Sequence, residues 1–121
     1  NKPMHVTAQS DRMGIRFSEA LPPLSATPLS RAVLPGTIQL PPDGKPILLL
    51  CDAQTIGGYP VLGHIIAADL PRAAQLRPGD TVCFSETTIT EAHRLLRHQH
   101  NMLATLQQGI NHTLDLAEKA E

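Results

Sequence analysis

The groups most suited to bind a small polar ligand are concentrated in residues 52–60, which read Asp-Ala-Gln-Thr-Ile-Gly-Gly-Tyr-Pro. A carboxylate, an amide, a hydroxyl and the single tyrosine of the chain can together orient such a ligand. Adjacent glycines accept positive φ and leave backbone N–H groups uncovered, which predicts a nest for an anion at Gly57 and Gly58. The alternative interpretation is a glycine-rich corner at which a strand bends. The candidate residues of this segment are Asp52, Gln54, Thr55, Gly57, Gly58 and Tyr59.

A second candidate lies in residues 10–14, Ser-Asp-Arg-Met-Gly, a charged turn-forming segment in front of an apolar run. The guanidinium of Arg12 can bind a carboxylate or a phosphate through two parallel hydrogen bonds. It can equally pair with Asp11 or a loop carbonyl and act as a structural clamp. The residues alone leave both interpretations open.

Several common catalytic patterns are missing from the sequence. Among the six histidines, His98 and His100 are two positions apart and His93 and His100 are seven apart, so neither pair has the i, i+4 spacing of a zinc-binding helix and no metal site is predicted. Gly44-Lys45 is followed by proline and has no matching glycine before it, which excludes a Walker phosphate loop. No nucleophile can be paired with a base from residue order, so the catalytic residues stay unassigned.

Composition limits the class of protein. The 121 residues carry 10 basic and 11 acidic side chains, and without a basic run we expect no nucleic-acid partner. The longest apolar runs have the length of strands, so no membrane span is predicted. Cys51 and Cys83 lie in apolar runs without a CxxC partner, which predicts buried reduced thiols and a cytoplasmic location. The chain opens on a polar stretch at Asn1, without Met, and we expect it to be a piece of a longer protein.

Short strand-like runs and explicit turns organise the first part of the chain. Pro41-Pro42-Asp43-Gly44 and Pro78-Gly79-Asp80 predict tight turns, because proline presets φ and Asp-Gly accepts the positive φ of a reversal. Closely spaced strands of this kind predict a compact β barrel or sandwich. The expected strands are residues 14–17, 37–40, 47–52, 61–68 and 81–84.

The last part of the chain has a helical period. Residues 71–76 predict a short helical turn, and Thr88 to Glu91 has the form of a capping box at the start of a long helix. Gly109 costs that helix about 1 kcal/mol relative to Ala. The apolar stripe of the helix is expected to pack on the barrel or on a neighbouring subunit. It is formed by Ile89, Ala92, Leu96, Leu103, Leu106, Ile110 and Leu114. We therefore expect a β domain over residues 1–87 and an amphipathic helix over residues 88–121.

Five segments in order carry a resemblance to a known family. They are residues 10–16 (SDRMGIR), 34–47 (LPGTIQLPPDGKPI), 52–60 (DAQTIGGYP), 68–71 (ADLP) and 77–80 (RPGD). Together they resemble the allophanate hydrolase subunit 2 family, which includes the C subunits of 5-oxoprolinases, KipA-type proteins and the carboxyltransferase region of urea carboxylase. The resemblance covers residues 10 to about 84 and implies a mainly β fold. The implied architecture is a cyclophilin-like β barrel with a long C-terminal α-helix, the carboxy-terminal one of two barrels in the whole polypeptide.

The resemblance also implies an activity and partners. The family's most common bacterial role is within an ATP-dependent 5-oxoprolinase, which opens 5-oxoproline to L-glutamate. The implied partners are a KipI-like subunit 1 (the B subunit), the chain's own amino-terminal barrel and a LamB/YcsF-type A subunit. A fragment alone is expected to be inactive. Two alternatives follow from the same resemblance: a KipA-type module that antagonises a KipI-like kinase inhibitor, and a biotin-dependent carboxyltransferase domain.

Motif residues of the family identify substrate or anion-binding candidates. Beyond the segment 52–60, the resemblance adds Arg12, Gln39 and Asp43. In the enzyme hypothesis Arg12 and the glycine pair line a cleft for an anion, and Asp52 and Tyr59 orient the substrate. The chain departs from the family at Ile15, where an aromatic is usual, and at Ile56, where Thr is usual. The second change removes a hydroxyl from the candidate site.

Overall fold

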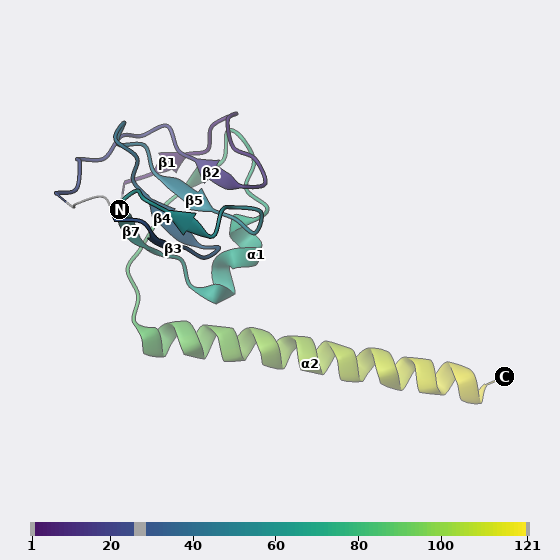
Figure 1. The fold of residues 1–121 in the computed structure, drawn as a ribbon. Helices are drawn as coiled ribbons and strands as arrows, with labels where there is room; N and C mark the ends of the chain where they lie inside the picture. The colour runs from purple at the N-terminus through teal and green to yellow at the C-terminus, as the bar shows by residue number, and fades with distance from the viewer. Residues whose placement is uncertain (1, 26–28, 121) are drawn as a thin grey trace. The chain divides into compact units, whose positions relative to one another are not determined.

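The computed structural model describes residues 2–25 and 29–120, and the chain divides into two units, Asn1–Glu86 and Thr87–Glu121 (Figure 1). The first unit is built of strands and the second of one long helix. The mainly β class with a long C-terminal helix is confirmed.

The described strands of the first unit form one four-stranded antiparallel sheet, in the order β2-β5-β4-β7, and two two-stranded sheets, β1-β8 and β3-β6. A 3-10 turn at Ala67–Asp69 leads into the short helix α1, Leu70–Ala73. The strand bounds are β1 Met4–His5, β2 Gly14–Arg16, β3 Arg31–Ala32, β4 Thr37–Gln39, β5 Ile47–Leu49, β6 Ile56–Gly57, β7 Val61–His64 and β8 Thr81–Val82. A closed barrel stays a prediction, because these strands make three separate sheets.

All five expected strands are present, each shorter than its apolar run, and β1, β3 and β6 are additional. The expected helical turn at 71–76 begins one residue earlier and ends at Ala73. Both expected tight turns are confirmed, because Gly44 and Gly79 have φ of 76° and 94°. In the first of them, the Gly44 N–H donates to the Pro41 carbonyl at 2.9 Å.

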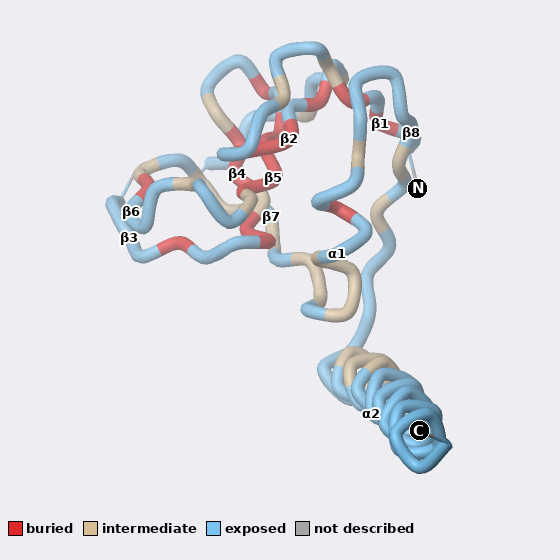
Figure 2. Tube along the Cα trace, turned by 90° about the vertical axis from the view of Figure 1, so that its right-hand side faces the viewer, coloured by how far each residue is buried: buried red, intermediate tan, exposed pale blue. Residues whose placement is uncertain are grey.

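The core of the first unit is mostly aliphatic, as the scarcity of aromatic residues indicates. Its one aromatic contact among the described residues is edge-to-face, between Phe17 and Phe84, with ring centroids 5.6 Å apart. The main buried cluster comprises Met4, Val6, Ile15, Phe17, Leu48 and Ala73, and a second comprises Val33, Ile47 and Leu49. Figure 2 shows these buried positions on and around the strands of the first unit.

The prediction that both cysteines are buried is wrong, because Cys51 and Cys83 are exposed. The strand β5 ends at Leu49, so Cys51 lies in the turn that follows and not in the sheet. Likewise β8 ends at Val82, one residue before Cys83. Both errors come from extending an apolar run beyond the end of its strand.

The second unit is the helix α2, Ile89–Lys119. The Thr88 hydroxyl accepts from the Glu91 N–H at 3.2 Å, as the capping box predicts. The Glu91 carboxylate accepts from the Arg94 side chain at 2.7 and 2.8 Å, so its partner is this arginine and not the backbone of the cap. Among the residues that the structure describes, no helix has the length and apolar character needed to cross a membrane.

Candidate functional site

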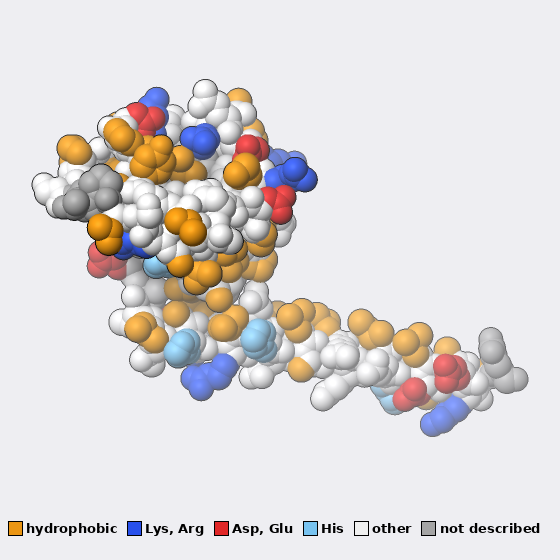
Figure 3. Space-filling view, viewed as in Figure 1, with side chains coloured by type: hydrophobic (Ala, Val, Ile, Leu, Met, Phe, Trp, Pro, Cys, Tyr) orange, Lys and Arg blue, Asp and Glu red, His pale blue; other side chains and the backbone are white. Residues whose placement is uncertain are grey.

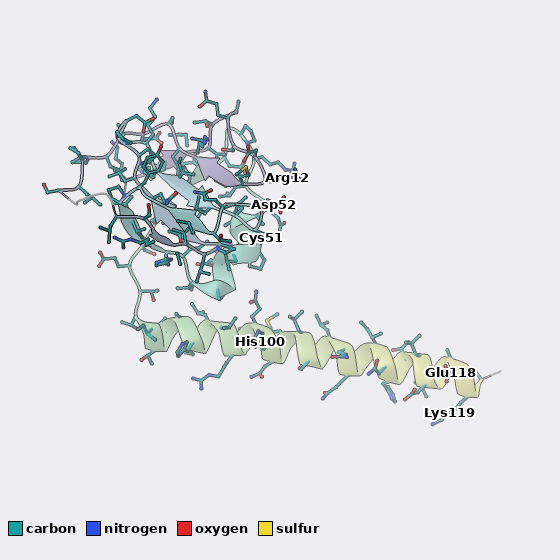
Figure 4. All side chains as sticks on the ribbon, viewed as in Figure 1. Arg12, Cys51, Asp52, His100, Glu118 and Lys119 are labelled. Carbon is teal, nitrogen blue, oxygen red and sulfur yellow. The ribbon has the colours of Figure 1, made fainter. Side chains whose placement is uncertain are left out.

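The pairing of β2 with β5 brings the two charged candidates of the first unit together. Gly14 lies opposite Leu49, so the loop before β2 and the loop after β5 meet at one end of the sheet. Arg12 Nε lies 3.5 Å from Asp52 Oδ2, and Figure 4 shows both residues at this edge. Their side chains are 90% and 54% exposed, so the ion pair contributes little to stability and leaves the guanidinium accessible to an anion.

Asp11 shapes the loop that presents Arg12. Its Oδ1 accepts from the backbone N–H groups of Met13 and Gly14, at 2.8 and 3.2 Å. This aspartate therefore stabilises the turn, and the clamp between Arg12 and Asp11 that the sequence left open is replaced by the pair with Asp52.

Gln39 is the most unusual of the candidates, since it is a polar residue that is only 1% exposed. Its Nε2 is buried and has no hydrogen-bond partner among the residues that the structure describes. A buried donor without an acceptor costs about 1–3 kcal/mol. This side chain therefore either destabilises the fold or donates a hydrogen bond to an acceptor on a ligand.

The side chain of Gln39 lies directly against Gly57. A Cβ placed on Gly57 would overlap Gln39 Nε2 and would also lie 3.4 Å from Val33 Cγ1. Glycine is needed here because a side chain would occupy the space that the amide fills.

The anion nest predicted at the glycine pair is wrong. The described glycines with positive φ are Gly36, Gly44 and Gly79, so neither Gly57 nor Gly58 has the conformation that a nest requires. Gly57 belongs to the extended strand β6, where it pairs with Arg31 of β3. The strand pairing fixes the backbone of this segment in place of the predicted loop.

The rest of the segment 52–60 runs along residues 31–40. The Thr55 carbonyl accepts from the Val33 N–H at 3.0 Å, and the Pro60 carbonyl accepts from the Leu40 N–H at 2.8 Å. Gln39 itself pairs with Ile47 of β5 and with Val61 of β7. The side chains of Gln54, Thr55 and Tyr59 are exposed.

Asp43 does not join this group. It lies in the turn from β4 to β5, at the end of β5 opposite to Asp52, and its Oδ1 accepts from the Lys45 N–H at 3.0 Å. The structure thus places these candidates in three locations. Arg12 and Asp52 form an exposed ion pair, Gln39 and Gly57 form a buried contact, and Asp43 lies in a turn.

One polar contact was missed from the sequence, between the buried Thr37 and the exposed His64. Thr37 is fully buried, its Oγ1 accepts from the Leu34 N–H at 3.2 Å, and the same oxygen lies 3.1 Å from His64 Nδ1. Thr37 and Gln39 are two residues apart on β4 and so share one face of the strand. The sequence showed only that polar and apolar residues alternate at Thr37, Ile38 and Gln39. In the structure the two polar residues are buried and Ile38 is partly buried.

The first unit also matches a family of known proteins. Residues 1–86 match the family described as carboxyltransferase domain, subdomain A and B. The chain belongs to this family. The match ends at the residue where the first unit ends.

Two curated relatives of this carboxyltransferase-family chain have the same name, that of the C subunit of 5-oxoprolinase. The chain is 46% identical over 108 residues to the protein from Haemophilus influenzae and 37% identical over 108 residues to the protein from Escherichia coli. These matches cover 86% of the chain but 34% of each relative. The resemblance found in the sequence is thereby confirmed.

Two solved structures share the fold of the chain. The structure of K. lactis urea amidolyase aligns with a TM-score of 0.75 and 25% identity, over 84% of this chain and 7% of that one. The structure of TTHA0988 aligns with a TM-score of 0.63 and 32% identity, over 70% of this chain and 17% of that one.

The groups gathered around segment 52–60 do not fit a triphosphate. Such a ligand is held by several cations or by a row of converging backbone N–H groups. The described residues here offer two guanidinium groups in different loops and strands: Arg12, which is paired with Asp52, and Arg31, which lies opposite Gly57 on β3. The backbone at Gly57 is extended and supplies no row of converging N–H groups. No chemical step through ATP is therefore assigned to these residues. In the described part of the chain, no three His, Cys, Asp or Glu side chains lie where they could hold a metal ion.

Proposed function

We propose that the chain is part of the C subunit of a cytoplasmic 5-oxoprolinase, an enzyme that opens the lactam ring of 5-oxoproline to give L-glutamate in a reaction driven by ATP. The observation that carries this proposal is the 46% identity to the Haemophilus influenzae protein of that name, over 86% of the chain. The whole enzyme includes a KipI-like B subunit, a LamB/YcsF-type A subunit, and the amino-terminal barrel that belongs to the same polypeptide as this chain.

Within that enzyme, we assign this chain to substrate binding. 5-Oxoproline offers a carboxylate and a lactam carbonyl. The accessible guanidinium of Arg12 can bind this carboxylate after its ion pair with Asp52 breaks. Gln39 pairs with Ile47 at the other end of β5, so its buried amide is not assigned to the same molecule.

The test combines the complete protein with its two partner subunits and measures ADP release that depends on 5-oxoproline. We expect Arg12→Ala to raise the KM for 5-oxoproline at least tenfold, because a charge-assisted bond to a carboxylate contributes about 1.5–3 kcal/mol. Arg16→Ala is the matched control, since Arg16 is also an exposed arginine and lies on β2. Full activity in Arg12→Ala would remove this residue from the site.

The assembled wild-type enzyme tests the function itself. Release of ADP and glutamate only when 5-oxoproline is present supports the proposal. Absence of that release, with all subunits present and correctly folded, would overturn it whatever the variants do.

A second candidate function is carboxyl transfer from a biotin carrier. It is favoured by the description of the matched family and by the similarity to urea amidolyase. Transfer of labelled carboxylate from a carboxylated biotin carrier to a small amide, catalysed by the complete protein, would support this candidate over the first.

A further inference from the structure

The helix α2 presents an apolar face along its whole length. None of its residues is buried, and seven of its large apolar residues, from Ile89 to Leu116, retain 55–77% of their accessible surface. Figure 3 shows hydrophobic side chains gathered along one side of this helix. At 1.5 Å per residue, 31 residues make a face about 46 Å long.

This face follows a heptad repeat with a spacing of 3.5 residues. Both isoleucines of α2 fall at a positions, and β-branched residues at a favour two-stranded parallel coiled coils. The a positions are Ile89, Leu96, Leu103, Ile110 and Ala117, and the d positions are Ala92, Gln99, Leu106 and Thr113.

Charged side chains avoid the edges of the repeat. Every Lys, Arg, Asp and Glu of α2 lies at a b, c or f position, on the side away from the a and d residues. The flanking e and g positions hold His, Gln, Gly, Leu and Met. Two copies of α2 can therefore approach along this face without the like-charge repulsion that e and g charges would create.

The two polar d residues select the orientation of such a pair. In a parallel, in-register pair, Gln99 faces Gln99 of the other copy and Thr113 faces Thr113, so their amides and hydroxyls can bond across the seam. In an antiparallel pair each d residue faces an a residue, and all a residues are apolar. Gln99 would then be buried without a partner, at a cost of about 1–3 kcal/mol.

A shallow groove on α2 supplies a hole for this packing. It is lined by three apolar residues, Leu106, Ile110 and Leu114, and by three smaller residues, Thr105, Gly109 and Thr113. Knobs from a facing helix insert into holes of four neighbouring residues, and the missing side chain of Gly109 widens this one.

We propose that α2 is a homodimerisation helix, which forms a parallel two-stranded coiled coil with α2 of a second copy of this chain. The self-complementary heptads, the neutral edges and the pairing of Gln99 with itself carry the proposal. It is independent of the enzymatic function proposed above.

Sedimentation equilibrium of the 121-residue chain tests the dimer. We expect a mass twice the 13.1 kDa of one chain, and we expect Leu106→Glu to raise the dissociation constant about 100-fold or more, because each dimer would bury two unpaired carboxylates. Gln108→Glu, which adds the same charge at an f position, is the matched control and should leave the dimer intact. A monomeric wild-type chain, or a dimer that survives Leu106→Glu, would overturn the proposal. Because Leu106→Glu could also unfold the helix, its far-UV circular dichroism is compared at concentrations where the control is monomeric.

Disulfide crosslinking tests the orientation. In a background with Cys51→Ser and Cys83→Ser, Gln99→Cys should form an interchain disulfide on mild oxidation, because parallel in-register d positions face each other. His98→Cys, at a c position, should not. Crosslinking of His98→Cys but not Gln99→Cys would overturn the parallel register.

Discussion

The two units of this chain use apolar residues in opposite ways. The first unit buries its apolar side chains in two clusters drawn from residues 4–73, whereas the helix α2 buries none of its residues. Burial of apolar surface is the main favourable term in folding, so the first unit carries a core of its own. The apolar face of α2 can contribute only when it meets another surface.

Truncating a buried side chain of the first unit should lower its free energy of unfolding far more than the same kind of truncation on α2. Phe17 is 1% exposed and contacts Phe84, so Phe17→Ala should lower the free energy of unfolding of the first unit by about 3–5 kcal/mol. The measurement is chemical denaturation followed by the fluorescence of Tyr59, the single tyrosine of a chain without tryptophan. Leu103→Ala on α2 is the comparison and should leave the Tyr59 transition within about 0.5 kcal/mol.

A variant of Phe17 that does not fold would leave no transition to compare, so Phe17→Leu provides a milder truncation. A destabilisation of the Tyr59 transition by Leu103→Ala as large as that by Phe17→Leu would contradict the division into two units.

The close contact of Gly57 with Gln39 predicts the next largest effect. Gly57→Ala should destabilise the first unit by about 1–3 kcal/mol, since its methyl group would overlap the buried amide. Gly63→Ala is the matched control, because a Cβ there meets no atom of the described residues within 4 Å. Denaturation monitored by Tyr59 fluorescence measures both.

The double variant Gln39→Ala/Gly57→Ala isolates the cause of that effect. If the overlap with Gln39 is responsible, the alanine at 57 should cost at least about 1 kcal/mol less in the Gln39→Ala background than alone. Equal costs in the two backgrounds would show that another contact excludes the side chain.

The sequence predicted the features that local chemistry determines. The turn at Gly44 was predictable because glycine tolerates its φ of 76°, and the start of α2 because Thr88 has the spacing of a cap. The strands β1, β3 and β6 were missed because a strand of two residues has no period. Apolar runs that continue past a strand end misled the prediction for Cys51.

The candidate site was less predictable because its contacts join distant parts of the chain. Arg12 meets Asp52 through the register of β2 with β5, which no local pattern contains. A glutamine on a strand is ordinarily expected to face solvent, whereas Gln39 is buried against Gly57. The family resemblance named both residues, but only the packing shows why the glycine is required.

A smaller effect is expected in α2. Gly109 lies inside the helix with open space where a Cβ would stand, so Gly109→Ala should stabilise α2 by about 1 kcal/mol. Thermal denaturation followed at 222 nm measures the change, while the Tyr59 signal of the first unit should not move. The measurement is made at concentrations where the chain is monomeric, and a loss of helix in Gly109→Ala there would contradict the open space around residue 109.

The smallest expected effect is a pH dependence confined to the first unit. Hydrogen bonds from the His5 side chain and backbone, at 2.5 and 2.7 Å, lower the pKa of Glu19 from 4.5 to about 2. A carboxyl whose pKa is lower in the folded state stabilises that state above the unfolded pKa of 4.5, and this contribution is lost as the pH falls from 4.5 through about 2. Glu19→Gln should therefore flatten the stability of the first unit between pH 4.5 and pH 2, measured by denaturation at a series of pH values. Glu118→Gln on α2 is the control. If it reduces the pH dependence of stability equally, the loss of any one carboxylate, and not the contact of Glu19 with His5, causes the effect.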